Sequence, residues 1–458
     1  MTDVTDASTV DGSLLDPAVQ ACPFPYYEQL HRKAPVYRMP ETGFYVISTY
    51  EDLKAVLGDP VTYSNDILIE HLAGEAAADL GRTYDEHLAE VGWGHVQTLQ
   101  RTDPPEHSRY RRLINRAFTP PMVKGMVPSV ERTSAALIDA FVDKGTCEFV
   151  ADFAFPLPGL VIGEQIGLEA NDIATFRRWA DAMLAPAQGL LVDDDSARHY
   201  SEIEAEAQRF FAPLLEERMT NPTGDLMSAL VAESADGDEA LSMAELQNIM
   251  NQLVTGGYTT TADAIANAML LLIEHPDQME LLRADRSLLR NFADEALRVA
   301  SSVQGLFRRS TVDSVLSGVH IPANSILHTR YGAANLDEGM FPDAGRMDIT
   351  RPNASKHLAF SRGPHFCVGQ PLAMQEIMIA FDQILDRLDD IALAPGSVPE
   401  RVPGLIFYSL KDLHITFTPR RYASGQRLPP RMDFHAIAPI TKTSTSPTMT
   451  IVKTMPAP

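Results

Sequence analysis

The sequence predicts a mainly α-helical protein with a small β portion. Apolar residues recur with helical spacing through most of 129–393, and proline or glycine interrupts them near 156–159, 222–224 and Pro276. No internal repeat and no low-complexity linker divides the 458 residues. One large domain is therefore expected, although the length alone would also allow two or three.

Short elements are expected on both sides of the helical stretch. Residues 34–48 alternate apolar and polar positions around a Glu-Thr-Gly turn, which predicts a β-hairpin, and 50–57 show helical spacing. Brief apolar segments at 318–321, 326–330 and 413–417 predict a few strands.

The two ends of the chain differ in composition from the domain between them. Residues 1–23 are acidic and polar, and we expect them to form a disordered leader. Residues 421–458 are rich in Pro, Ser and Thr and are expected to form an extended tail. The domain itself is therefore expected to span 24–420.

Composition and charge limit the partners of the protein. The net charge of −23 disfavours nucleic acid, which would repel the chain. The longest apolar run, near 268–273, falls short of the roughly 18 residues of a membrane helix, so no membrane insertion is expected. The first twenty residues lack a signal-peptide pattern. Cys22, Cys147 and Cys367 are too few for a disulfide scaffold, and they fit a reducing cytoplasm.

A long helix is expected from Ser242 to about His275. Ser242 and Glu245 form a capping box, and apolar residues follow with helical spacing until Pro276. The middle is locally weak, because the glycine pair 256–257 costs about 1 kcal/mol of helix propensity per residue and a run of three threonines follows. Such a weak point suits a helix that opens a groove beside a bound molecule.

The most informative segment is 360–369, Phe-Ser-Arg-Gly-Pro-His-Phe-Cys-Val-Gly, which precedes an amphipathic helix. We interpret this segment as a loop that brings the Cys367 sulfur to the iron of a haem. Such a loop must run close to the flat porphyrin ring, and Gly363 and Gly369 would permit this approach and positive φ values. Phe360 can pack beside the ring, and His365 can donate to a haem propionate. Two alternatives are a small buried hydrophobic Cys367 and a haem-free hydrolase with Cys367 as nucleophile, which has no clear third orienting residue.

This segment resembles the signature of the cytochrome P-450 superfamily, in which an aromatic residue, two glycines and an arginine or histidine surround a ligand cysteine. The resemblance covers about residues 24–420 and implies the single-domain triangular P-450 fold with haem b as cofactor. It implies that Cys367 is the iron ligand and donates electron density to the metal. It also implies that Phe360, Gly363, His365 and Gly369 belong to the haem site.

Further matches to the family concern charged residues. Residues 103–111 resemble the family's segment that enters the helix crossing one haem edge, which implies that His107 and Arg111, one turn apart, bind a haem propionate, and Arg308 matches another propionate ligand. Glu295 and Arg298 match the family's Glu-x-x-Arg motif, which stabilises the fold behind the haem. Arg346 is expected to be the third member of this network, with Arg351 as the alternative.

The weak point of the long helix matches the family's oxygen-activating motif with one departure. Gly256-Gly257-Tyr258-Thr259-Thr260 places Thr259 where the family has an acid. Thr260 retains the alcohol of the acid and alcohol pair that relays protons, so Thr260 and Thr259 are the expected catalytic residues. Protons would come instead through water or through Asp263.

The resemblance implies a bacterial-type monooxygenase that inserts one oxygen atom of O2 into a small or medium hydrophobic molecule. Electrons would come from NAD(P)H through a ferredoxin and a ferredoxin reductase, or a similar donor, and the basic face of Arg109, Arg112 and Arg116 suits an acidic redox protein. Because the acid is missing at Thr259, a peroxide-using haem-thiolate enzyme is the alternative. The expected pocket residues are Leu68, Leu253, Gly256, Val303, Leu306 and Phe407.

Overall fold

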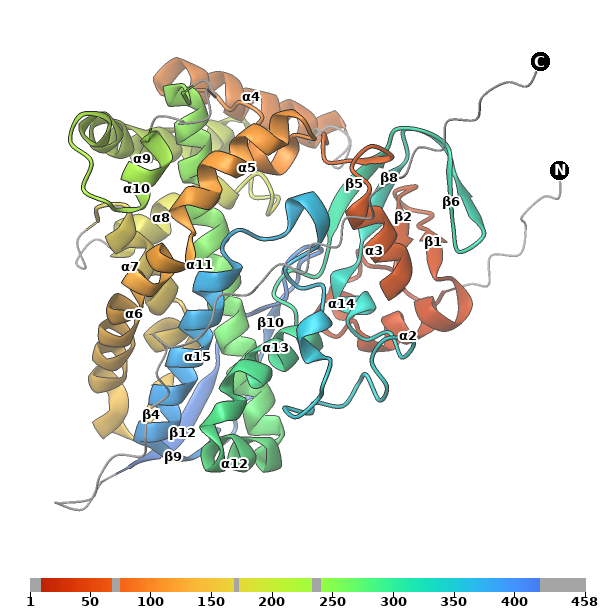
Figure 1. Ribbon diagram of the computed structural model, residues 1–458. Helices are drawn as coiled ribbons and strands as arrows, with labels where there is room; N and C mark the ends of the chain where they lie inside the picture. The colour runs from red at the N-terminus through yellow and green to blue at the C-terminus, as the bar shows by residue number, and fades with distance from the viewer. Residues whose placement is uncertain (1–9, 68–74, 169–172, 233–239, 421–458) are drawn as a thin grey trace, which may run out of the picture.

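The computed structural model describes residues 10–67, 75–168, 173–232 and 240–420 (Figure 1). Helices make up most of this part, and a small mixed sheet lies on the side opposite α9 and α10. The expectation of a mainly α-helical protein with a small β portion is confirmed. Within the described ranges, no helix is both long enough and apolar enough to cross a membrane.

The sheet near the N-terminus has five strands in the order β1-β2-β8-β5-β3. Its strands are β1 (Val36–Arg38), β2 (Tyr45–Ile47), β3 (Tyr63–Ser64), β5 (Leu306–Ser310) and β8 (Ile326–Thr329). β1 and β2 form the predicted hairpin, and β2 pairs with β8 in parallel. The sheet therefore joins the first 65 residues to the segment that precedes the cysteine loop.

Three smaller sheets complete the β portion. Their strands are β4 (Thr146–Glu148), β12 (His414–Pro419) and β9 (Leu388–Leu393) in one sheet, β6 (Ser314–Leu316) and β7 (Val319–Ile321) in the second, and β10 (Arg401–Val402) and β11 (Ser409–Leu410) in the third. The strands predicted at 318–321, 326–330 and 413–417 correspond to β7, β8 and β12.

The segment 10–23 differs from the expected disordered leader. It contains α1 (Pro17–Ala21), which Asp16 caps, and the side chains of Val10 and Leu14 are buried. They pack against Tyr26 and Tyr27 of α2 (Phe24–Lys33). Burial of these two apolar side chains stabilises a segment whose other residues are mostly polar. Residues 1–9 and the predicted tail at 421–458 lie outside the described residues.

The helical part forms one large hydrophobic core. The N-terminal helices are α3 (Tyr50–Gly58), α4 (Glu75–Val91), α5 (Glu106–Ala117), α6 (Pro120–Phe141), α7 (Pro156–Gln165), α8 (Ile173–Leu184), α9 (Asp194–Thr220) and α10 (Leu226–Val231). The C-terminal helices are α11 (Met243–Glu274), α12 (Pro276–Ala284), α13 (Leu289–Val299), α14 (Tyr331–Ala334) and α15 (Gln370–Arg387).

Helix α11 is the central element of the molecule (Figure 1). The predicted capping box is present, since Ser242 Oγ accepts from Glu245 N and the Glu245 carboxylate accepts from Ser242 N. The helix has 32 residues, which corresponds to about 48 Å. It packs against α7, α8, α9, α13 and α15, so residues in its middle can reach groups from both halves of the chain.

Candidate active site

The cysteine loop makes a tight turn before α15. Residues 363–365 form one turn of 3-10 helix, and Cys367 N donates to Phe360 O at 2.9 Å. Gly369 is the N-cap residue of α15, so the thiol lies just before the first turn of that helix. The Cys367 side chain is exposed, whereas the neighbouring Phe360 packs partly against the main core.

The two glycines of the loop have different roles. Gly363 has φ +71°, and a Cβ added there would lie 2.3 Å from Leu57 O at the end of α3. This residue therefore needs to be glycine because of the backbone of α3. Gly369 has a helical conformation with φ −79°, so the expected positive φ at this position is wrong. A Cβ at Gly369 would lie 3.9 Å from Cys367 Sγ, an ordinary contact.

The surroundings of Cys367 have two opposite effects on the charged thiolate form of its side chain. Although the Cys367 side chain is accessible, desolvation by the protein atoms around it raises the pKa of the thiol, while hydrogen bonds from the backbone N–H groups of Gly369 and Gln370, and the charge of Arg111, act in the opposite direction. The N–H groups at the start of α15 therefore stabilise a thiolate, as expected for a metal ligand at a helix N-terminus.

Four basic side chains converge beside the thiol, and we call them the basic cluster: His107 and Arg111 of α5, Arg308 of β5 and His365 of the cysteine loop. The rings of His107 and His365 lie 4.1 Å apart between centroids. Both Nε2 atoms are buried and lack a hydrogen-bond partner, and the nearest carboxylate oxygen to His365 Nε2, on Asp103, is 3.9 Å away.

The basic cluster has more positive groups than nearby acids can balance. Burial, followed by the charge of Arg111, lowers the pKa of His107 to about 4. Burial, followed by the charges of His107, Arg308 and Arg111, lowers the pKa of His365 to about 2. Two neutral imidazoles with unused nitrogens beside two guanidinium groups form a site for an anion. An accessible thiol next to this anion site fits haem, whose iron takes one thiolate and whose propionates are anionic.

The middle of α11 presents polar groups at the expected weak point. Thr260 Oγ1 donates to Gly256 O at 2.7 Å, a back-bond that competes with the regular helix pattern. Gly256 is exposed, and a Cβ added there would meet no atom within 4 Å. The helix nevertheless continues without a break through Gly256 and Gly257. Thr259 is half-buried, and Asp263 is fully buried one turn further on.

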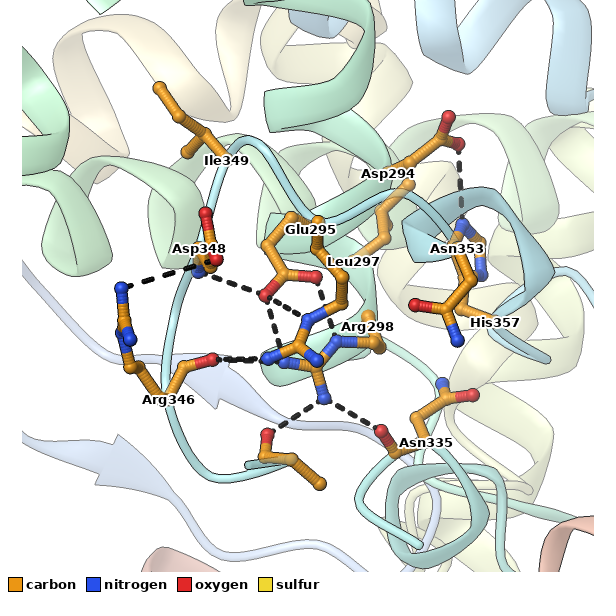
Figure 2. Close-up of polar contacts among 12 residues, drawn as sticks. Asp294, Glu295, Leu297, Arg298, Asn335, Arg346, Asp348, Ile349, Asn353 and His357 are labelled. Atoms are coloured by element: carbon orange, nitrogen blue, oxygen red, sulfur yellow. Dashed lines mark hydrogen bonds and ion pairs between the residues drawn. The ribbon is translucent and has the colours of Figure 1, made fainter. Parts of the chain in front are cut away.

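The charge network around Glu295 contains Arg351. The side chain of Arg346 lies outside it and points towards Asp348 (Figure 2). Glu295 accepts from Arg298 Nε at 2.7 Å and Nη2 at 2.8 Å, and from Arg351 Nε at 3.0 Å. The Arg346 side chain is 67% exposed and lies 4.0 Å from Asp348. The prediction of Arg346 is wrong because this residue contributes only its carbonyl, which accepts from Arg298 and Arg351.

The expected pocket residues lie on several elements. Val303 and Phe407 form an antiparallel bridge, both half-buried, while Leu253 on α11 is buried and Leu306 at the start of β5 is 40% exposed. Leu68 lies outside the described residues. The backbone beside Phe407 is tied to the N-terminal segment: Arg330 donates to Leu405 O at 2.5 Å and to Tyr27 Oη at 2.7 Å. Tyr27 Oη donates in turn to Gln304 Oε1 at 2.5 Å.

Sequence reasoning missed a second polar group, in which Tyr84 and Glu204 are buried and the other members are more accessible, and which we call the His95 cluster: Tyr84, Asp85, His95, Glu204 and Asn251. His95 bonds Asp85 Oδ1 at 2.8 Å and Glu204 Oε1 at 3.0 Å, and Asn251 of α11 donates to the same Glu204 oxygen at 2.8 Å. The cluster ties α4 and the segment after it to α9 and α11. Its members are up to 167 residues apart, and no motif or periodicity marks them.

Comparison with known proteins agrees with this geometry. The family model for cytochrome P-450 matches residues 193–404. The cytochrome P-450 monooxygenase PikC of Streptomyces venezuelae is 34% identical over 89% of this chain and 94% of its own length. The 6-deoxyerythronolide B hydroxylase of Saccharopolyspora erythraea is 33% identical over 80% of this chain and 89% of its own length. A solved cytochrome P-450 of Chondromyces apiculatus is 32% identical, covers 89% of this chain and 98% of its own, and superposes with a TM-score of 0.77.

The chain belongs to the cytochrome P-450 superfamily and has the fold of that family. It is a monooxygenase of the haem-thiolate class, and membership of the family implies haem as its cofactor.

Proposed function

We propose that this enzyme binds haem b through the Cys367 thiolate and inserts one atom of O2 into a small or medium hydrophobic molecule. When bound, thiolate-ligated haem activates O2 and supplies the oxygen atom that is transferred. The observation that carries the proposal is the accessible Cys367 thiol beside the basic cluster, in which two buried imidazole nitrogens have no partner.

The residues of the loop and of the basic cluster would hold the cofactor. The N–H groups of Gly369 and Gln370 stabilise the thiolate, and Phe360 provides an apolar wall. His107, Arg111, Arg308 and His365 would receive the propionates, because the two guanidinium groups supply positive charge and Nε2 of His107 and of His365 has no hydrogen-bond partner. Gly363 allows the loop to lie against α3.

Thr260 and Thr259 are proposed to act on the oxygen side of the cofactor. Thr260 keeps its hydroxyl bonded to Gly256 O, so its oxygen remains an acceptor and can hold a water or receive a proton. Thr259 offers a second hydroxyl but no acid. Substrate would contact Leu68, Leu253, Gly256, Val303, Leu306 and Phe407, most of which are apolar.

Electrons are proposed to come from NAD(P)H in the cytoplasm through a ferredoxin and its reductase or a similar donor. The basic residues Arg109, Arg112 and Arg116 of α5 support an acidic partner. Arg109 donates to Glu245 Oε1 at 2.7 Å and to Ala240 O, so its guanidinium turns towards α11.

The test is the absorbance spectrum of the reduced, CO-bound protein. The wild type is expected to show the red-shifted Soret band of a thiolate-ligated haem, and Cys367→Ser is expected to lose it while Cys147→Ser retains it. A folded wild-type protein that takes up haem without this band would contradict the proposal.

Peroxide-driven chemistry is the second candidate, and the absence of an acid at Thr259 favours it. Product formation with NADPH, a ferredoxin, its reductase and O2 supports the monooxygenase cycle. Product formation only with added hydrogen peroxide would favour the alternative.

A further inference from the structure

Asp263 is an acid whose position in α11 the cofactor-binding residues do not explain. It lies four residues after Thr259 and three after Thr260, and it is only 1% exposed. Side chains on a helix lean towards its N-terminus and cover the preceding turn. Asp263 therefore lies one turn beyond Thr259 and Thr260 on the same side of α11.

The carboxyl of Asp263 has few partners. Ser409 Oγ donates to Oδ2 at 2.8 Å, whereas Oδ1 is buried without a hydrogen-bond partner. The nearest cation is Arg401, but its guanidinium donates to Asn267 Oδ1 at 2.8 Å and stacks on the Tyr408 ring at 3.4 Å. A buried carboxylate with one hydroxyl partner is poorly stabilised, so the neutral acid is favoured. Burial raises the pKa of Asp263 to about 7.

The two sides of this carboxyl differ in their access to water. Ser409 and Arg401 are half-buried in the hairpin formed by β10 and β11, so Oδ2 is linked through a hydroxyl to a more accessible region. Oδ1 has no such link. A group that is neutral near pH 7, has one unused oxygen and touches a hydroxyl on its other side is suited to give up a proton and take one back.

A purely structural role would not require an acid at this position. The one hydrogen bond that the structure gives to the carboxyl comes from a donor, and the amide oxygen of an asparagine would accept it equally well. Asparagine would also avoid the cost of an ionisable group in a buried site.

We propose that Asp263 is the proton reservoir of this enzyme and supplies the proton that the Thr259 position cannot. The O–H bond of the Asp263 carboxyl breaks, and its proton passes to the oxygen side of the site through water that Thr260 Oγ1 holds as an acceptor, while Thr260 keeps its own proton bonded to Gly256 O. Asp263 is left as a carboxylate and takes a proton from solvent by way of Ser409. The inference rests on the proposed function, because it needs the oxygen site to lie beside Thr260.

The first test asks whether the proton is present and uses the resting, haem-loaded enzyme without turnover. Infrared difference spectra at pH 6 between wild type and Asp263→Asn are expected to show one C=O band of a protonated carboxyl, which shifts in D2O. Glu376→Gln, which removes another buried acid whose pKa burial raises, is the matched control and should not remove this band. The absence of any carboxyl band from the wild-type minus Asp263→Asn difference would overturn the proposal.

The second test asks whether the proton is used. Consumption of O2 with NADPH, a ferredoxin and its reductase should slow about 100-fold in Asp263→Asn, a typical effect of removing a general acid. The solvent isotope effect should rise, and Asp263→Glu should recover part of the rate. Equal rates in wild type and Asp263→Asn would overturn the proposal. The reduced CO spectrum separates this failure from a failure of the proposed function, because that spectrum should remain normal in Asp263→Asn.

Discussion

Glu295 and Asp263 are both buried acids, yet their carboxyl groups have very different numbers of hydrogen-bond donors. Glu295 accepts three hydrogen bonds from two guanidinium groups and one from Asp348 N, so its charge is fully compensated (Figure 2). Asp263 has a single hydroxyl partner, and burial raises its pKa to about 7. The depth of burial alone therefore does not decide whether an acid is charged or protonated. The number of hydrogen-bond donors around the carboxyl group also decides it.

The largest effect is expected from breaking the compensated site. Arg298→Ala leaves Glu295 with Arg351 alone and also removes the donor to Asn335 O and Ala344 O. Loss of one partner of a buried pair costs about 3–5 kcal/mol. Urea unfolding should show a loss of this size in the free energy of unfolding.

Arg346→Ala is the matched control for this network, because that side chain is exposed while its carbonyl remains in place. Its effect should stay within about 0.5 kcal/mol. A loss at Arg346 as large as the loss at Arg298 would mean that the Arg346 side chain, and not Arg351, completes the network.

A smaller effect, which depends on pH, is expected at the uncompensated acid. The folded protein holds the Asp263 proton up to about pH 7, whereas the unfolded chain loses it near its ordinary value of 3.8. Stability from this group is therefore complete below pH 4 and falls as the pH rises towards 7, by at most about 1.4 kcal/mol per pH unit.

Unfolding free energies of wild type and Asp263→Asn, measured from pH 4 to pH 8, test this sign. The asparagine variant should lack the decline and become the more stable protein at pH 8. Parallel curves for the two proteins would show that Asp263 is already ionised in the folded state.

The smallest effect is expected at the His95 cluster. There the charge of the buried acid Glu204 is compensated by the imidazole of His95, which can itself lose its proton. Burial lowers the pKa of His95, but the charge of Glu204 and its bonds to Asp85 and Glu204 outweigh this and raise it to about 10. The stabilisation is therefore complete below pH 6.5 and is lost as the pH rises through 10.

His95→Gln should lower the free energy of unfolding by about 2 kcal/mol at pH 6, the usual value for hydrogen bonds to a charged group. The difference from wild type should shrink above pH 9. A constant difference across this range would indicate that His95 acts through packing on Tyr84, whose ring stacks on it at 5.9 Å.

The sequence predicted those parts of the site that are local in the chain. The cysteine loop, the Glu295 and Arg298 pair and the capping box of α11 each depend on residues at most nine positions apart, so their spacing indicates their geometry. Arg351 could not be separated from Arg346 in this way, because the path of the loop between them decides which guanidinium turns inward. The ordered segment 10–23 and the His95 cluster depend on contacts between distant elements, which local patterns do not encode.

The contact of Tyr27 with Gln304 and Arg330 links the N-terminal segment to the proposed pocket. Val10 and Leu14 support Tyr26 and Tyr27, Arg330 joins Tyr27 to Leu405, and Leu405 lies two residues before Phe407. Shortening the chain to begin at Pro23 would therefore remove support from the backbone beside Phe407. We propose residues 10–30 as a place to tune which molecules this enzyme accepts without altering any of the proposed pocket residues.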